Sequence, residues 1–101
     1  MIQIKVKKEN TLYQVICIKG HSGYDISGKD IVCAGVSSIV ITSINAIMRM
    51  DEKAISYNQA EGLIEINIKK HTKEVDILME NMMDLLKELQ EQYSNYIKIY
   101  E

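Results

Sequence analysis

The order of apolar and polar residues predicts five β-strands. Near the start of the chain, Ile2, Ile4 and Val6 alternate with polar residues, which is typical of a strand with one buried face. The next apolar segment is rich in β-branched residues and follows a short polar turn, so the two segments predict a hairpin. A second hairpin and a short final strand are predicted in the same way. The five strands are expected at residues 2–8, 12–19, 53–58, 63–68 and 95–100.

Two helices are predicted from longer segments. Residues 31–50 are apolar almost all the way round and are too many for one strand, which indicates a largely buried helix. Asp30 comes directly before this segment and is a good N-cap residue. A second helix is expected from its capping residue Thr72 to about Tyr93, with one apolar stripe on an otherwise charged surface.

The predicted order ββαββαβ indicates an α+β fold. The 101 residues are enough for a single domain, residues 1–101, with one hydrophobic core. Because hairpins pair antiparallel, we expect a mostly antiparallel sheet packed with two helices. An open sheet with such apolar faces favours a homodimer. The final strand is then either part of the dimer interface or an interior strand.

Composition and charge limit the classes of protein to consider. Apolar residues make up 47% of the chain and charged residues 26%, as in an ordinary globular protein. The chain has no unbroken run of about 18 apolar residues, so no membrane span is predicted. The alternation of apolar and polar residues at its start is unlike a signal peptide. We therefore expect a cytoplasmic location without a membrane partner. A net charge of -2 argues against direct nucleic-acid binding, which usually requires a basic face.

The chain has two cysteines, Cys17 and Cys33. Two are too few for a disulfide scaffold, and they lack the four-ligand spacing of a zinc site. We expect neither a metal ion nor a cofactor. Cys17 lies mid-strand between two isoleucines and is predicted to be a small buried residue.

Cys33 lies where a catalytic thiol would be favoured. If Asp30 is the N-cap, Cys33 is the third residue of the helix, among backbone N–H groups that have no acceptor within the helix. These N–H dipoles favour an anion, and the thiolate is the nucleophile that a cysteine enzyme requires. We expect the amides of Cys33 and a neighbour to form an oxyanion hole.

His21 is the candidate general base for Cys33. The 11 residues between them allow the chain to fold back and bring the two side chains together. Gly20, Gly23 and Gly28 give this segment room to move and allow a peptide backbone to come close, so it is a candidate substrate loop.

Each of these residues also has a purely structural interpretation. A cysteine in an apolar helix is more often a small buried side chain than a nucleophile. A histidine after a strand is usually an ordinary loop residue. Capping alone explains Asp30, so whether its carboxylate is also catalytic, by orienting other groups, stays open.

The sequence from Gly20 to Ala34 contains the pattern Gly-His-x-Gly followed by Gly-x-Asp-x-Val-Cys-Ala. This pattern resembles the signature of the ribosomal-processing cysteine protease family, Prp. The resemblance covers the whole chain and implies a single Prp-like cysteine protease domain. It places the catalytic dyad of the family on His21 and Cys33. The remaining motif positions of the family fall on Gly20, Asp30 and Ser37.

Family members are small bacterial proteins, typically homodimers, that remove a short apolar N-terminal extension containing aromatic residues from a large-subunit ribosomal protein before assembly. The resemblance implies the same function and partners here. Two residues depart from the family pattern. Ser22 and Gly35 both stand where alanine is usual.

Three hypotheses follow for the function. The first is a cysteine endopeptidase (a thiol protease, hence a hydrolase) acting in ribosome biogenesis through His21 and Cys33. The alternative is a non-catalytic ribosome-associated module that binds a peptide with its loop and uses Cys33 only for packing. A third hypothesis, a redox-sensing thiol, has less support because Cys17 is the only other cysteine and is predicted to be buried.

Overall fold

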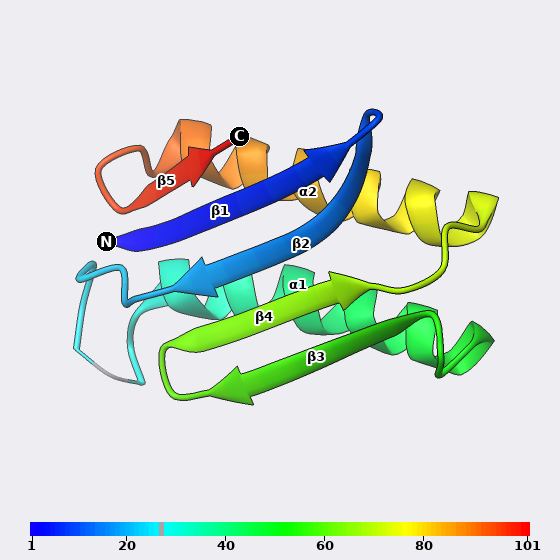
Figure 1. Ribbon diagram of the computed structural model, residues 1–101. Coiled ribbons are helices and arrows are strands. Elements are labelled where there is room, and N and C mark those ends of the chain that lie inside the picture. The colour runs from blue at the N-terminus through cyan, green and yellow to red at the C-terminus, as the bar shows by residue number, and fades with distance from the viewer. Residues whose placement is uncertain (27) are drawn as a thin grey trace.

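The computed structural model describes residues 1–26 and 28–101, and its elements follow the predicted order. Five strands form one sheet, and both helices cover the same face of that sheet (Figure 1). The elements are β1 (Ile2–Glu9), β2 (Leu12–Lys19), α1 (Ile31–Met50), β3 (Ile55–Ala60), β4 (Leu63–Ile68), α2 (Lys73–Gln92) and β5 (Ile97–Tyr100).

The sheet is mostly antiparallel, as predicted. Its strand order is β3-β4-β2-β1-β5, and the pairs β3–β4, β4–β2 and β2–β1 are antiparallel. The last pair is parallel, with Ile2 opposite Ile97 and Ile4 opposite Ile99. The final strand therefore lies at an edge of the sheet, although Ile97 itself is buried.

The core lies between the sheet and the helices. Alternate residues of each inner strand point toward the helices, and α1 contributes a buried stripe at helical spacing. The methionines of α2 are part of this core, because Met79, Met82 and Met83 are almost fully buried. Each large apolar side chain buried in this way stabilises the fold by roughly 1.5–3 kcal/mol. The buried stripe of α1 consists of Val32, Val36, Val40, Ser43, Ile44 and Ile47.

The second hairpin differs from its prediction in where its strands lie. We expected its first strand at residues 53–58, followed by a four-residue turn. The strand instead begins at Ile55 and continues to Ala60, which pairs with Leu63. A two-residue turn is sufficient because Gly62 adopts a φ of +68°, a left-handed conformation that glycine takes without steric cost.

Helix α1 is long and apolar enough to cross a bilayer by length and composition, with a mean hydropathy of 2.0. The expectation of no membrane span counted only unbroken apolar runs, and the serines, threonine and asparagine of this segment interrupt them. In the fold, α1 packs one face on the sheet, but only 33% of its 18-residue apolar window is buried. The expectation of a largely buried helix was therefore wrong, because one face of α1 stays open.

Candidate active site

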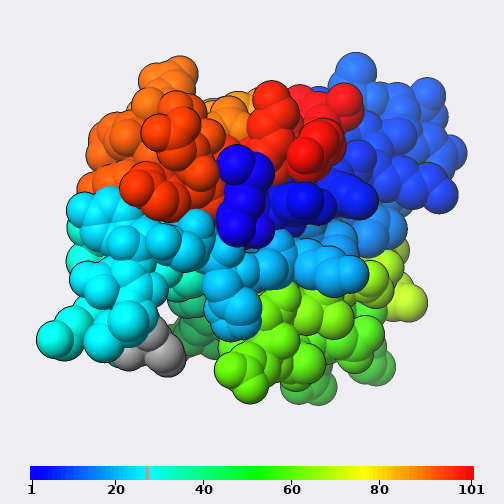
Figure 2. All heavy atoms as spheres, turned by 90° about the vertical axis from the view of Figure 1, so that its left-hand side faces the viewer, coloured from blue at the N-terminus to red at the C-terminus, as the bar shows by residue number. Residues whose placement is uncertain are grey.

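The predicted site residues gather at one end of the sheet. There β2 ends, the loop of residues 20–30 leads into α1, and the β3–β4 turn lies beside the loop (Figure 2). The backbone N–H of Gly20 donates to the carbonyl oxygen of Gly62 at 2.8 Å, which ties the loop to the turn. Gly20 has a φ of +102°, and a Cβ on it would lie 2.6 Å from the carbonyl oxygen of Met1. Only glycine fits this close approach, which sets where the loop leaves the sheet.

Asp30 caps α1 as predicted. Its Oδ1 accepts the backbone N–H groups of Val32 at 3.0 Å and Cys33 at 2.9 Å, so Cys33 is the third helical residue. Partial burial raises the pKa of Asp30, but hydrogen bonds from Ser22 and Cys33 outweigh this effect and lower it from its ordinary value of 3.8 to about 2. Asp30 is therefore a carboxylate throughout the neutral range.

This capping changes the expected oxyanion hole. We expected the amides of Cys33 and a neighbour to be free for a substrate oxygen. The N–H groups of Val32 and Cys33 instead donate to the Asp30 carboxylate, and that of Ala34 donates to the Asp30 carbonyl at 3.1 Å. The expectation was wrong because the cap side chain satisfies the same donors that it considered free.

The N–H group that does face the sulfur of Cys33 comes from Ser22. This backbone N–H donates to Cys33 Sγ at 3.3 Å. The side chain of Ser22 is 4% exposed; its hydroxyl donates to Oδ2 of Asp30 and accepts the N–H of Tyr24 at 3.1 Å. Sequence reasoning noted Ser22 only as a departure from the family pattern. A hydroxyl between the motif histidine and glycine was the one available signal.

His21 and Cys33 line the same two cavities. The first has a volume of about 290 Å³ and the second about 510 Å³, and Ser37 also lines both. Gly20 lines the first cavity, together with apolar side chains of the sheet and of α1. The structure thus brings the predicted dyad and Ser37 together. The second cavity is lined in addition by Gly23, Asp25, Gly28, Asp30, Ala34 and Glu61.

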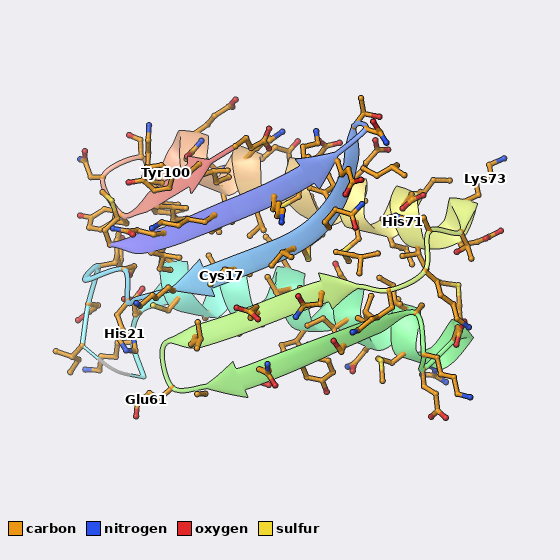
Figure 3. The ribbon with its side chains drawn as sticks, viewed as in Figure 1. Cys17, His21, Glu61, His71, Lys73 and Tyr100 are labelled. Carbon is orange, nitrogen blue, oxygen red and sulfur yellow. The ribbon has the colours of Figure 1, made fainter. Side chains whose placement is uncertain are left out.

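The imidazole of His21 is exposed and lies against the β3–β4 turn. Figure 3 shows His21 near Glu61 at this end of the molecule, with His71 at the opposite end. A Cβ on Gly62 would lie 3.0 Å from Nε2 of His21. His71 is exposed and pairs with Asp76, Nδ1 to Oδ1, at 2.8 Å. Gly62 and Glu61 are site residues that the sequence analysis treated only as a turn.

A tyrosine cluster holds the loop on its other side. The ring of Tyr24 makes edge-on contacts with Tyr93, at a centroid distance of 5.7 Å, and with Tyr96, at 5.1 Å. Edge-on pairs of this kind are favourable beyond the area that they bury. The loop is therefore attached at one point to the β3–β4 turn and at another to the segment between α2 and β5.

Cys17 is not buried as predicted. Inner positions of β2 are filled by Ile16 and Ile18, so Cys17 points to the face of the sheet without helices, between Lys5 and Glu65 of the neighbouring strands (Figure 3). It is half-buried and, unlike Cys33, lines neither of the two cavities. Among the described residues, no group of three or more histidine, cysteine or acidic side chains is placed to hold a metal ion.

The comparison with protein families decides to which family the chain belongs. The family model described as cysteine protease Prp matches residues 1–98. The chain belongs to the Prp family of cysteine proteases. Two curated relatives, both named ribosomal processing cysteine protease Prp and both from Staphylococcus aureus, are 29% identical over 101 residues, spanning 97% of this chain and 94% of each relative.

Solved Prp structures have the same fold. The structure of S. aureus Prp with a covalently linked product peptide matches with a TM-score of 0.92 at 24% identity, over 98% of this chain and 97% of the other. S. aureus Prp with a substrate peptide gives 0.87 at 23% identity, over 99% and 98%. A Streptococcus mutans protein gives 0.84 at 24% identity, over 98% and 91%. The resemblance of the Gly20–Ala34 motif to the Prp signature is thus confirmed at the level of the family.

Proposed function

We propose that the chain is a cysteine endopeptidase in which Cys33 is the nucleophile and His21 the general base. We further propose that it removes the N-terminal extension of a large-subunit ribosomal protein during ribosome assembly. One observation supports the assignment most strongly. The thiol at the third position of a capped helix and the imidazole line the same two cavities, and a backbone N–H is directed at the sulfur.

The chemistry needs only these groups and the substrate. His21 takes the proton of the Cys33 thiol, and the sulfur forms a bond with the carbonyl carbon of the scissile peptide. The C–N bond then breaks as His21 returns the proton to the departing amine. Water, deprotonated by His21, attacks the thioester, which releases the new carboxyl group and restores the thiol. No redox partner takes part.

The cavity walls fit an extended peptide with apolar side chains. Ile2, Ile18, Val36 and Ile64 line the smaller cavity beside Cys33. Such a surface favours the apolar and aromatic residues that Prp proteases are expected to remove, because it takes apolar surface out of water. The names of the S. aureus relatives supply the ribosomal context of the proposed substrate.

The proposed function brings three further proposals with it. A ribosome-assembly substrate places the enzyme in the cytoplasm. We propose a homodimer, because the face of the sheet opposite the helices carries half-buried side chains such as Val15 and Leu63. We propose that it does not bind nucleic acid directly, since its net charge is -2. Sedimentation of the purified protein would test the dimer.

The test of the protease is cleavage of a ribosomal protein that carries an N-terminal extension. Cys33→Ala and His21→Ala should each abolish cleavage, as followed by mass spectrometry of the products. Cys17→Ala is the matched control, because Cys17 is the other thiol and lines neither cavity. This variant should cleave the substrate at the normal rate. Equal cleavage by wild type and Cys33→Ala would refute the proposal. Peptide binding without any cleavage by the wild-type protein would favour the binding-module alternative.

A further inference from the structure

We propose that Ser22 is a positioning residue for the nucleophile: its hydroxyl, bonded to Asp30, holds the backbone N–H of Ser22 against the sulfur of Cys33. This inference rests on the proposed function, in which Cys33 reacts as a thiolate. The side chain of Ser22 is neither part of the family motif nor part of the proposed His21–Cys33 dyad. The backbone N–H of Ser22 is the group that stabilises the sulfur anion.

The N–H groups of Val32, Cys33 and Ala34 already have acceptors. The cap carboxylate occupies the N–H groups of Val32 and Cys33, and the Asp30 carbonyl occupies that of Ala34. These three N–H groups are therefore all bonded to the capping residue Asp30. The hydrogen bond that reaches the sulfur comes from the loop, over the 3.3 Å between the nitrogen of Ser22 and Sγ of Cys33.

The hydroxyl of Ser22 fixes the position of its own backbone N–H. The two carboxylate oxygens of Asp30 accept different hydrogen bonds. Oδ1 caps the helix, and Oδ2 accepts the hydroxyl of Ser22. The same hydroxyl accepts the N–H of Tyr24, so its donor and acceptor capacity are both used. A buried hydroxyl that loses its hydrogen-bond partners costs free energy, so these bonds resist breaking. The loop and the first turn of α1 are therefore held as one unit.

The charged side chains around Cys33 affect how easily its sulfur becomes an anion. The titratable side chains that share the cavities of Cys33 are His21 and Asp25 from the loop, Asp30 from the cap and Glu61 from the β3–β4 turn. The carboxylates of Asp25, Asp30 and Glu61 line the second cavity together with one imidazole, and negative charges near the sulfur oppose a further negative charge on it. A directed N–H offsets part of this repulsion, since hydrogen bonds to charged groups are stronger than those to neutral ones.

The experiment measures the reactivity of Cys33 with iodoacetamide as a function of pH, using peptide mass spectrometry. Cys17 in the same molecule is the internal reference for general loosening of the fold. In Ser22→Ala we expect the pH of half-maximal alkylation of Cys33 to rise and its rate at neutral pH to fall roughly 3- to 10-fold. Ser22→Thr keeps the hydroxyl and should retain most of the wild-type rate.

Two controls separate positioning from stability. Ser43 is also buried, and its hydroxyl donates to the carbonyl oxygen of Ile39 at 2.8 Å within α1. Ser43→Ala should lower the unfolding temperature and leave the alkylation profile of Cys33 unchanged. If Ser22→Ala folds poorly, Ser22→Val replaces it, because valine has nearly the shape of threonine without the hydroxyl. The Ser22→Val variant should then show the higher pH of half-maximal alkylation of Cys33, and Ser22→Thr should not.

The results distinguish this proposal from the protease itself. A Cys33 profile in Ser22→Ala or Ser22→Val that superimposes on that of the wild type would overturn the positioning role, whatever the cleavage rate. An equal shift in Ser43→Ala would also overturn it, by assigning the effect to stability. The predicted shift in a protein that cleaves no ribosomal substrate would support the role of Ser22 and contradict the proposed function instead.

Discussion

The imidazole of His21 rests on Gly62 so closely that a Cβ on Gly62 would lie 3.0 Å from Nε2 and 3.5 Å from Cε1 of the ring. The carbonyl oxygen of the same glycine accepts the N–H of Gly20, the residue before His21, at 2.8 Å. The β3–β4 turn thus supports the proposed general base from two sides. Any side chain at this position would compete with the ring for space.

Gly62→Ala should therefore reduce both cleavage and stability, for separate reasons. The added methyl group displaces the His21 ring by a few tenths of an ångström or more, which lowers kcat because the base must stay within reach of the thiol. The φ of +68° is strained for alanine, so the free energy of unfolding should fall by about 1 kcal/mol. Kinetics of cleavage and urea unfolding of the same variant measure the two effects.

Asn10→Ala supplies the matched control for backbone strain. Asn10 has a φ of 52° in the β1–β2 turn, at the opposite end of the sheet from the loop. This variant should lose stability and keep the wild-type kcat. A Gly62→Ala protein that is destabilised but has normal kcat would show that the turn does not support His21.

Local pattern was enough to predict the seven elements, because strand alternation, helical periodicity and an N-cap residue are all short-range features. The helix beginning at Ile31 and the position of Cys33 in its first turn followed from Asp30 alone. The contacts of the site were not predictable in this way. Gly62 meets His21 because β4 pairs with β2, a pairing between segments far apart in the sequence. The periodicity of each segment contains no information on which strand will be its neighbour.

The same reasoning explains what the sequence analysis misjudged around Cys33. Helix amides were expected to be free because the cap was considered only as a start signal. Which oxygen of Asp30 accepts which donor depends on how the loop folds back, and that decides the role of Ser22. Cys17 was misjudged for a simpler reason. Two flanking isoleucines on a strand place the residue between them on the opposite face.

Asp30 allows a test of whether its carboxylate is catalytic or structural. The carboxylate caps the helix, accepts the hydroxyl of Ser22 and also accepts a hydrogen bond from the side chain of Cys33. The cap and the bond to Ser22 predict a structural role. Asparagine is as good an N-cap as aspartate, so Asp30→Asn should keep its stability and most of its cleavage rate, whereas Asp30→Ala should lose about 1–2 kcal/mol of stability. Thermal unfolding and cleavage of both variants are compared. A stable Asp30→Asn protein without activity would instead assign a catalytic role to the charge.

The lowered pKa of Asp30 predicts how stability depends on pH. The pKa is about 2 in the folded chain against an ordinary value of 3.8, so the carboxylate is favoured by folding. Its contribution is complete above about pH 4 and is lost as the pH falls through 2. The free energy of unfolding, measured in urea between pH 6 and pH 2, should decline less steeply in Asp30→Asn than in the wild type. Parallel curves would contradict the assignment.

The tyrosine cluster should hold the loop for substrate binding. Tyr24→Ala removes both edge-on contacts, which are worth about 0.5–1.5 kcal/mol each, while Tyr24→Phe keeps the ring. We expect Tyr24→Ala to raise KM more than it lowers kcat and to speed hydrogen exchange of the loop amides. Tyr24→Phe should resemble the wild type in both measurements. Unchanged exchange in Tyr24→Ala would mean that the hydrogen bonds of Gly20 and Ser22 are enough to order the loop.

Gly35 gives a prediction whose sign depends on one neighbouring side chain. Glycine within a helix costs roughly 0.5–1 kcal/mol relative to alanine, so Gly35→Ala should gain that amount if the methyl group fits. A Cβ at Gly35 would lie 3.3 Å from Cδ2 of Leu89 in α2, so Leu89 must move by a few tenths of an ångström. Leu89 is only half-buried and the contact is the flexible end of its side chain, which can rotate away. We therefore expect a net stabilisation of about 0.5 kcal/mol and a higher unfolding temperature.

The effect of Leu89 can be isolated with a double-variant cycle. In a Leu89→Ala background the contact is absent, so Gly35→Ala should show the full helix-propensity gain, and the difference between backgrounds measures the crowding. If Gly35→Ala lowers the unfolding temperature in both backgrounds, the limit is the backbone separation of α1 and α2 rather than one leucine. In that case the glycine would be required for the close packing of the two helices beside Cys33.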